Sequence, residues 1–213
     1  MGLKMQDMTS NPEALRQKMI DAGCELFSKI GYNETTIRMI TDKAEIDIRC
    51  FYYLFESKED LLGDVVQQLA DSEAAAFDRI VSGLSDPLVK LAAMLNEMFS
   101  FRSARELMIG HVKKRYVIVN YMFKERIMEK AGPLVERVIA EGMKRGLMHT
   151  LEPAQTALLI LNNMIFVLSG LLSSDGVEKG KMLKAFFHMT EASLGIEPGT
   201  LNIGEGCLEP VAE

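Results

Sequence analysis

The stretch from Thr35 to Lys58 constrains the fold more than any other part of the chain, because it has the pattern of two short helices separated by a tight break. Each half has an inward-facing set of apolar or small residues. These sets are Ile37, Ile40, Thr41 and Ala44 in the first half, and Ile46, Phe51, Leu54 and Phe55 in the second. Helices this short do not persist alone in water, since nucleation costs more than so few turns return. Flanking segments must therefore brace them.

The outward side of the second short helix carries Ile48, Arg49, Tyr52 and Tyr53. A helix pair that buries one side and displays aromatic and hydrogen-bonding groups on the other is typical of a helix-turn-helix. The second helix of such a pair has the size of the DNA major groove. The pattern therefore predicts a DNA-binding head.

Two longer helices are expected to brace this pair. Residues 10–13, Ser-Asn-Pro-Glu, combine a capping side chain, a proline and an acid, which predicts a helix start, and Gly31 ends that helix. Ser57 begins a third clear helix that runs to roughly Val81. Because no run of alternating β-branched residues bounded by turns occurs, the sequence predicts an all-α fold.

The second half is expected to be helical as well. A helix is predicted from Pro87 to a break near Arg102-Ser103, followed by a helical segment of about 104–122. The next segment, about 123–145, is expected to bend or restart at Gly132-Pro133. Two further helices are predicted at about 153–173 and 177–194. The last two are apolar on more than one side and must be covered on all sides. A second copy of the chain is the simplest cover, which predicts a homodimer through these two helices.

Composition narrows the class of protein. Of 213 residues, 48% are hydrophobic and 25% charged, which is typical of a globular protein with a real core. The N-terminus lacks an apolar signal core, so a cytoplasmic location is expected. The apolar stretch 157–172 is short and contains two asparagines, so no membrane span is expected. Scattered cysteines and histidines predict neither a disulfide framework nor a metal site, and no cofactor is indicated.

The charge is unusual for a nucleic-acid-binding protein. The net charge is −6, and residues 1–62 hold 8 Lys+Arg against 11 Asp+Glu, a net charge of −3. Attraction to phosphates must then come from a few placed cations instead of the summed field.

From Ala22 to Leu62 the chain contains the motifs L-F…G-Y…T-T-I-R and F-Y-Y-x-F-x-S-K-E-x-L-L. They resemble the DNA-binding head of the TetR family of bacterial transcriptional repressors. The resemblance implies a homodimer whose two heads insert their third helices into successive major grooves of a double-stranded operator. It also implies a small-molecule pocket in the C-terminal part.

By position, the resemblance implies that Thr36, Lys58 and the Tyr52 hydroxyl contact phosphates, and that Arg38 reaches the backbone or an adjacent base. The residues nearest base edges would be Ile48, Arg49 and Cys50. The expected DNA-binding set is Thr36, Arg38, Asp47, Ile48, Arg49, Cys50, Tyr52, Tyr53 and Lys58.

The chain departs from the family pattern between the two short helices. Glu45 stands where the family usually has glycine, at a position that often needs a positive φ. Asp47 replaces a small or hydroxyl residue and is expected to cap the next helix. Arg49 stands where the family often has glycine, and it adds a cation able to pair with guanine. The operator sequence therefore does not follow from relatives.

Methionines and aromatic residues are frequent in the second half. Singly each is typical of a core, but together they suit a deformable apolar pocket, in which an asparagine offers a hydrogen bond. The expected pocket residues are Met94, Met98, Phe101, Tyr116, Tyr121, Met122, Asn162, Met164 and Phe166.

The sequence thus predicts a DNA-binding head at residues 10–57 and a ligand-binding and dimerisation domain at 58–195, with 58–81 as a linking helix and 196–213 as a flexible tail. The function expected is a ligand-responsive repressor released by a small, largely apolar effector. One alternative is a dimeric small-molecule or protein-binding module with a degenerate head. A second is an all-α enzyme, although no nucleophile–base pair or phosphate-cradling glycine loop is present.

Overall fold

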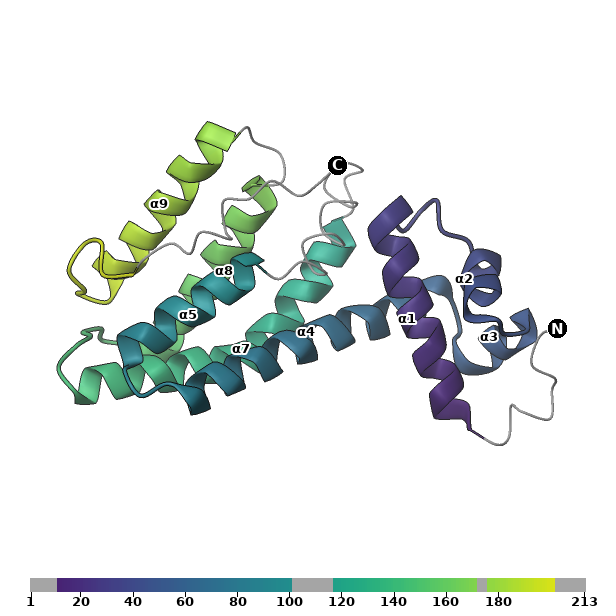
Figure 1. The fold of residues 1–213 in the computed structure, drawn as a ribbon, viewed down its shortest axis with the longest axis horizontal. Helices are drawn as coiled ribbons and strands as arrows, with labels where there is room; N and C mark the ends of the chain where they lie inside the picture. The colour runs from purple at the N-terminus through teal and green to yellow at the C-terminus, as the bar shows by residue number, and fades with distance from the viewer. Residues whose placement is uncertain (1–10, 101–116, 172–175, 202–213) are drawn as a thin grey trace. The chain divides into compact units, whose positions relative to one another are not determined.

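The computed structural model describes residues 11–100, 117–171 and 176–201 (Figure 1). Its helices are α1 (Pro12–Ile30), α2 (Ile37–Ala44), α3 (Ile48–Leu54), α4 (Lys58–Gly83), α5 (Pro87–Ser100), α7 (Val117–Lys144), α8 (Pro153–Leu171) and α9 (Gly176–Ser193). These ranges contain no strand, which confirms the all-α prediction. The break expected at 102–103 and most of the segment expected at 104–122 lie outside the described residues. Within the described helices, none is long and apolar enough to cross a membrane.

The helices form two compact units. The described part of the first comprises residues 11–69 and 117–122, and that of the second comprises 70–100, 123–171 and 176–201. The first unit extends beyond residue 57 because the start of α4 packs closely on α1. A Cβ at Gly23 of α1 would lie 3.1 Å from the Leu61 side chain of α4, so glycine permits this approach.

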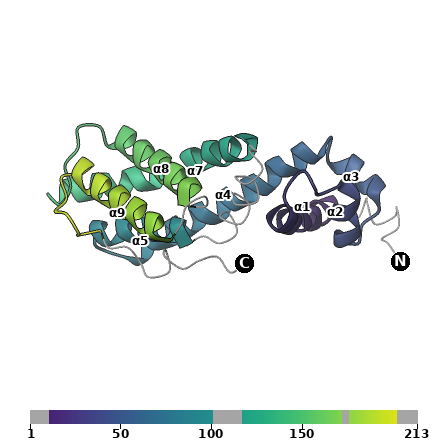
Figure 2. The same cartoon turned by 90° about the horizontal axis from the view of Figure 1, so that it is seen from above.

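In the first unit, α2 and α3 lie beside α1 (Figures 1 and 2). The Asn11 side chain accepts a hydrogen bond from the Ala14 N–H at 3.0 Å and caps α1, as the sequence predicts. Phe27 of α1 and Phe51 of α3 are fully buried. Burial of one side of each short helix against α1 supplies the stability that the helices lack alone.

Arg16 of α1 ties α3 to α4. Its Nη1 donates to the Leu54 carbonyl oxygen at 2.6 Å, and its Nε donates to Asp64 Oδ2 at 2.6 Å. The guanidinium also lies 4.3 Å from the ring centroid of Phe55. One side chain therefore holds the C-terminal end of α3 and the first turns of α4 together.

The turn between α2 and α3 is built around Glu45, which adopts a left-handed conformation with φ 59° and ψ 37°. Among the described residues it is the one non-glycine with a positive φ. The Ile46 N–H donates to the Thr41 carbonyl at 2.9 Å, and the Ile46 side chain is buried. This is a Schellman-type helix end with its apolar contact. It fixes the angle between the two helices at a cost in backbone strain.

Replacing Glu45 with glycine should raise the free energy of unfolding by up to about 1 kcal/mol. Glycine removes the left-handed penalty of about 1–2 kcal/mol, and its extra entropy in the unfolded chain offsets part of the gain. Denaturant unfolding checks this. Glu45→Ala keeps the Cβ and should give no gain, so equal stabilisation by both substitutions would contradict strain at Glu45.

The second unit packs α5, α7, α8 and α9 around an apolar core. Phe99 of α5 contacts the rings of Phe186 and Phe187 of α9, with centroids 5.4 and 6.1 Å apart. The buried Lys90 ammonium of α5 donates to Glu141 Oε2 of α7 at 2.7 Å, which lowers the pKa of Glu141. Helices α8 and α9 lie side by side in both ribbon views (Figures 1 and 2).

Two expectations for this unit can be compared with the structure. Helix α7 continues through Pro133, so of the two alternatives, a bend or a restart, the restart is wrong. Pro133 and Glu129 are exposed, so the carbonyl left without its usual donor can be hydrated. The tail expected to be flexible from residue 196 is anchored at two positions. The Leu201 N–H donates to Glu191 Oε1 at 2.8 Å, and Ile196 and Leu201 are buried.

Candidate functional site

Helix α3 has one buried and one exposed side. Phe51 and Cys50 face inward, whereas Ile48, Tyr52 and Tyr53 are exposed, with Tyr52 at 61% and Tyr53 at 65%. We call the exposed set formed with the start of α2 the head surface. It consists of Thr36, Arg38, Ile48, Arg49, Tyr52 and Tyr53. Six of the nine residues predicted for DNA binding are thus exposed in the first unit.

Asp47 both caps α3 and holds Arg49. Its Oδ1 accepts a hydrogen bond from the Arg49 backbone N–H at 2.9 Å. The Arg49 guanidinium donates to both carboxylate oxygens, also at 2.9 Å. The Arg49 side-chain and backbone hydrogen bonds lower the pKa of Asp47 to about 2. The cation best suited to read guanine is therefore paired with a carboxylate in the free protein, and because the pair is exposed its release costs little.

Replacing Asp47 with asparagine should strengthen DNA binding severalfold, mostly independently of sequence. Asparagine still caps α3, but the head loses a negative charge near the phosphates and Arg49 is released. Binding titrations over a salt series check this, with a steeper salt dependence expected for the variant. Glu178→Gln is the control in the second unit, where it removes a carboxylate that pairs with the exposed Lys181 at 2.9 Å. An unchanged or weaker affinity of Asp47→Asn would contradict the prediction.

Thr36 and Cys50, two further residues of the predicted set, differ in their surroundings. Thr36 Oγ1 accepts a hydrogen bond from the Met39 N–H at 3.2 Å and caps α2, so Thr36 lies at the N-terminal end of this helix, and its contact with a phosphate stays a prediction. Cys50 differs: its side chain is only 2% exposed. The expectation that it lies nearest the bases is wrong, because α3 turns this position toward the core. Burial also raises the pKa of its thiol, which keeps the thiol protonated.

Lys58 has a structural role that the sequence did not indicate. Its Nζ donates to the carbonyl oxygens of Tyr32 and Thr35, each at 2.7 Å, and lies 4.2 Å from the Tyr32 ring centroid. Burial lowers the pKa of Lys58. The ammonium therefore ties the loop before α2 to the start of α4. It has three N–H groups, and a phosphate contact through the third stays a prediction.

The residues predicted to line a ligand pocket do not form one set. Met94, Met98 and Met164 are buried core residues, and Asn162 and Met122 are half-buried. Tyr121 and Phe166 are exposed in the single chain, Phe166 by 73%, so neither belongs to the buried core, and their place in a ligand pocket stays a prediction. Phe101 and Tyr116 lie outside the described residues. Sequence spacing identified apolar positions but not which side of each helix would be covered.

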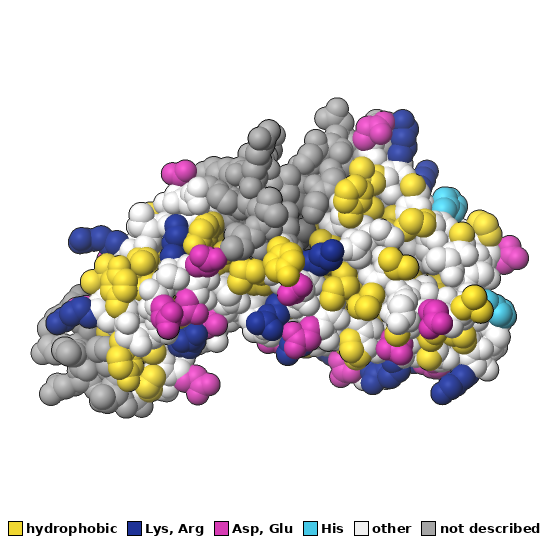
Figure 3. Space-filling model, turned by 180° about the vertical axis from the view of Figure 1, so that it is seen from behind, with side chains coloured by type: hydrophobic (Ala, Val, Ile, Leu, Met, Phe, Trp, Pro, Cys, Tyr) yellow, Lys and Arg dark blue, Asp and Glu magenta, His cyan; other side chains and the backbone are white. Residues whose placement is uncertain are grey.

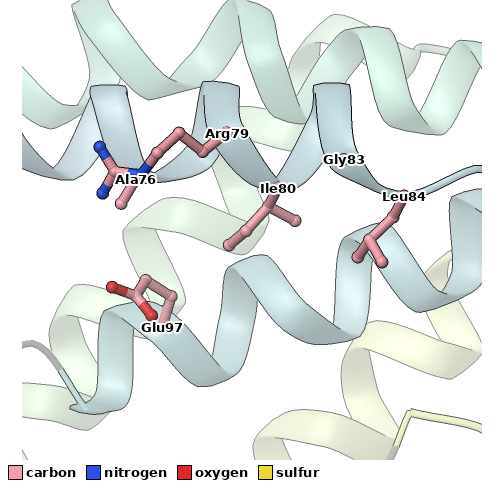
Figure 4. A pocket seen from close by; sticks show the side chains of 6 residues that line it. All are labelled: Ala76, Arg79, Ile80, Gly83, Leu84 and Glu97. Atoms are coloured by element: carbon pink, nitrogen blue, oxygen red, sulfur yellow. The ribbon is translucent and has the colours of Figure 1, made fainter.

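A groove of about 370 Å³ lies between α4 and α5 in the second unit (Figure 4). Ala76, Arg79, Ile80 and Gly83 of α4 and the following Leu84 line it, with Glu97 of α5 opposite. In Figure 4 the Glu97 carboxylate rises from α5 toward Ala76 and Arg79. None of the seven predicted pocket residues that the structure describes borders this groove.

One turn before Ala76, Glu73 of α4 is fully buried. The sequence reasoning missed it, although a signal was present. The buried positions of α4 include Leu62, Val66, Leu69, Ala76 and Phe77, and at steps of three or four an acid stands between Leu69 and Ala76. A charged residue at such a position requires an explanation.

Comparisons with known proteins fit this geometry. The family model described as bacterial regulatory proteins, tetR family, matches residues 19–65, which contain α2, α3 and parts of α1 and α4. The chain is 28% identical over 93 residues to the HTH-type transcriptional repressor KstR2 of Mycolicibacterium smegmatis, a match that covers 44% of this chain and 45% of that protein. It is 32% identical over 79 residues to the HTH-type transcriptional regulator HbdR of Aromatoleum sp., covering 37% and 34%. The matches thus span less than half the length of these two relatives.

Solved structures resemble the whole described fold. A RolR complex with resorcinol has a TM-score of 0.69 at 20% identity, and the match covers 96% of this chain and 98% of that one. A SmeT–triclosan complex has a TM-score of 0.65 at 19% identity, covering 94% and 100%. At these identities the likeness establishes the shared fold.

Proposed function

Because the chain belongs to the TetR family of bacterial regulatory proteins, we propose that it is a ligand-responsive transcriptional repressor that a small effector releases from its operator. The observation that carries the proposal is the head surface, where Arg49, Tyr52 and Tyr53 stand exposed on a short, firmly braced α3. Apolar ring surface exposed to water is unfavourable in free energy, and a binding partner that covers it removes this cost. A cation and phenolic hydroxyls on a helix of this size match the edges and phosphates of a DNA major groove.

The groups on the head surface divide by role. Arg49 and Ile48 lie at the start of α3 and are assigned to base edges, and Tyr52 and Thr36 to phosphates. Lys58 and Arg38 add positive charge at the border. Because the head has a net negative charge, its affinity for DNA depends on these few contacts, and the loss of one contact should lower that affinity strongly.

The experiment is a fluorescence titration of the DNA upstream of the protein's own gene, with wild type, Tyr52→Ala and Tyr52→Phe. Wild-type affinity should fall as salt rises from about 50 mM to about 200 mM, because phosphate contacts release counterions. Tyr52→Ala should weaken binding at least roughly tenfold and Tyr52→Phe less, as the ring remains. Leu151→Ala, at an exposed residue of the second unit, is the control. Wild-type affinity no higher for upstream DNA than for random DNA would favour the degenerate-head alternative.

We assign α8 and α9 to a homodimer interface. Their outward residues Leu158, Leu159, Phe166 and Met189 are exposed in the single chain. The face of the second unit in Figure 3 likewise shows apolar side chains between charged ones. Adjacent helices with outward apolar residues suit a self-complementary contact with a second copy, in which the same patch serves both subunits.

Phe166→Glu combined with Leu159→Glu should convert the dimer to a monomer, because both large apolar side chains would be replaced by charges within the buried contact. Light scattering after size-exclusion chromatography measures the mass. Leu151→Glu is the matched control, since Leu151 is 96% exposed just before α8 and lies outside the proposed interface. A dimer that survives the double substitution would place the interface elsewhere.

The response to the effector follows from two heads on one dimer. Both heads must meet half-sites roughly 34 Å apart, and an effector that favours another dimer shape lowers operator affinity. Two similar structures hold the small aromatic molecules resorcinol and triclosan, which supports a small-molecule effector here. By linkage, operator DNA must weaken effector binding by the same factor. A DNA-binding regulator of this kind acts in the cytoplasm.

A further inference from the structure

Glu73 is a carboxyl group that the fold buries without a partner. Its side chain is fully buried, and neither carboxylate oxygen has a hydrogen-bond partner among the described residues. Desolvation, with a further contribution from the charge of Glu97, raises the pKa of Glu73 to about 8. Burial of a polar group without a hydrogen bond destabilises a protein, so Glu73 costs stability that an apolar residue would not.

The position of Glu73 links it to the groove between α4 and α5. Glu73 precedes the lining residue Ala76 by one turn on the same side of α4, and Glu97 borders the groove (Figure 4). Glu97 also acts electrostatically on Glu73. Glu97 therefore borders the groove, and the buried Glu73 lies one turn of α4 before its lining residue Ala76. The other lining residues are Arg79, Ile80 and Gly83 of α4 and the following Leu84.

We propose that Glu73 is the anchor of the effector site and takes the protonated amine of an otherwise apolar molecule whose body lies along the α4–α5 groove. The proposal rests on the proposed function, because it names the chemical class of that repressor's effector. An ammonium group supplies the hydrogen-bond donors and the positive charge that Glu73 lacks. A carboxylate-bearing ligand would instead bring a second negative charge near Glu97, whose charge already acts on Glu73. A neutral alcohol would satisfy one hydrogen bond without the charge.

Binding of the ammonium form also has a proton signature. In the free protein at neutral pH, Glu73 holds its proton, and pairing with a cation requires the carboxylate. Amine binding should therefore release close to one proton per site, whereas binding of an alcohol should release none. A purely structural role of Glu73 would produce no such difference between ligands.

The test uses phenethylamine, phenethyl alcohol and phenylacetic acid, which share one apolar body and differ in the polar group. Calorimetric titration of the full-length protein in two buffers of different ionisation enthalpy gives affinity and proton release. The amine should bind at least roughly tenfold more tightly than the alcohol or the acid. Glu73→Gln should abolish that preference and the proton release, while alcohol binding stays near the wild-type value. Glu129→Gln, on the exposed side of α7, is the control.

Circular dichroism confirms that each variant is folded, and Glu73→Ala provides a second variant if glutamine is not tolerated. Equal wild-type affinity for amine and alcohol, undetectable amine binding, or an amine preference that persists without the carboxyl would each overturn the proposal. The proposed function is tested separately by operator titration without any probe. Tight operator binding without a preference for the amine would support the repressor function and overturn the amine site. Amine binding without operator binding would support the amine site and overturn the repressor function.

Discussion

Replacing Glu73 with glutamine is expected to stabilise the protein by on the order of 4 kcal/mol at about pH 8.5, and to change its stability little at about pH 4.5. The cause is the raised pKa of Glu73, about 8 in the folded chain against 4.5 for an ordinary glutamate side chain. Burial of the carboxyl is the larger cause, and the nearby charge of Glu97 is the smaller. Glutamine has nearly the same shape as glutamate, but its side chain does not titrate.

The sign follows from proton binding. Between the unfolded and the folded pKa, the folded protein holds a proton on Glu73 that the unfolded chain has lost. Stability therefore falls as pH rises through this window, and the loss is complete above a pH of about 8. Other groups titrate in wild type and variant alike, so the difference between the two isolates Glu73.

Denaturant unfolding at equal protein concentration, at several pH values between about 4.5 and about 8.5, measures this difference, since dimer stability depends on concentration. Glu129→Gln should follow the wild-type curve. Parallel curves for wild type and Glu73→Gln would mean that Glu73 is solvated or paired in solution, which would also remove the basis for an amine site.

Replacing Arg16 with alanine is expected to lower the free energy of unfolding by about 2 kcal/mol and to weaken operator binding roughly tenfold. The substitution removes the hydrogen bonds to Leu54 and Asp64 and the cation–π contact with Phe55. Without them the C-terminal end of α3 is held less firmly to α4. The lost affinity reflects a less ordered α3, because Arg16 itself is not part of the head surface.

Arg137→Ala is the matched control, since Arg137 makes an exposed pair with Asp78 at 3.3 Å and its loss should change stability by less than about 0.5 kcal/mol. Denaturant unfolding and operator titration check both variants. An Arg16→Ala variant as stable and as tightly bound as wild type would show that packing alone positions α3.

Local sequence signals predicted the first unit well. The helix start at residues 10–13, the cap at Asp47 and the left-handed position at Glu45 depend on residues within a few positions of one another. The Arg16 and Lys58 ties join residues far apart in the chain, and no local pattern could indicate them.

The candidate effector site could not be predicted in the same way. Helical spacing predicts which positions are apolar, yet it does not say which neighbour covers Met94 or leaves Phe166 exposed. Those outcomes depend on how several long helices pack together. Glu73 was the exception, because an acid at a buried position of α4 was visible in the spacing itself.

The central claim is that the head surface of a dimer reads DNA. It is tested most directly by footprinting the upstream DNA of the protein's own gene with wild type and with Tyr52→Ala. The account predicts two protected half-sites with centres roughly 34 Å apart, lost at the same protein concentration in the variant. The claim would be contradicted if the dimeric wild-type protein protected no DNA, or if Tyr52→Ala left the protection unchanged.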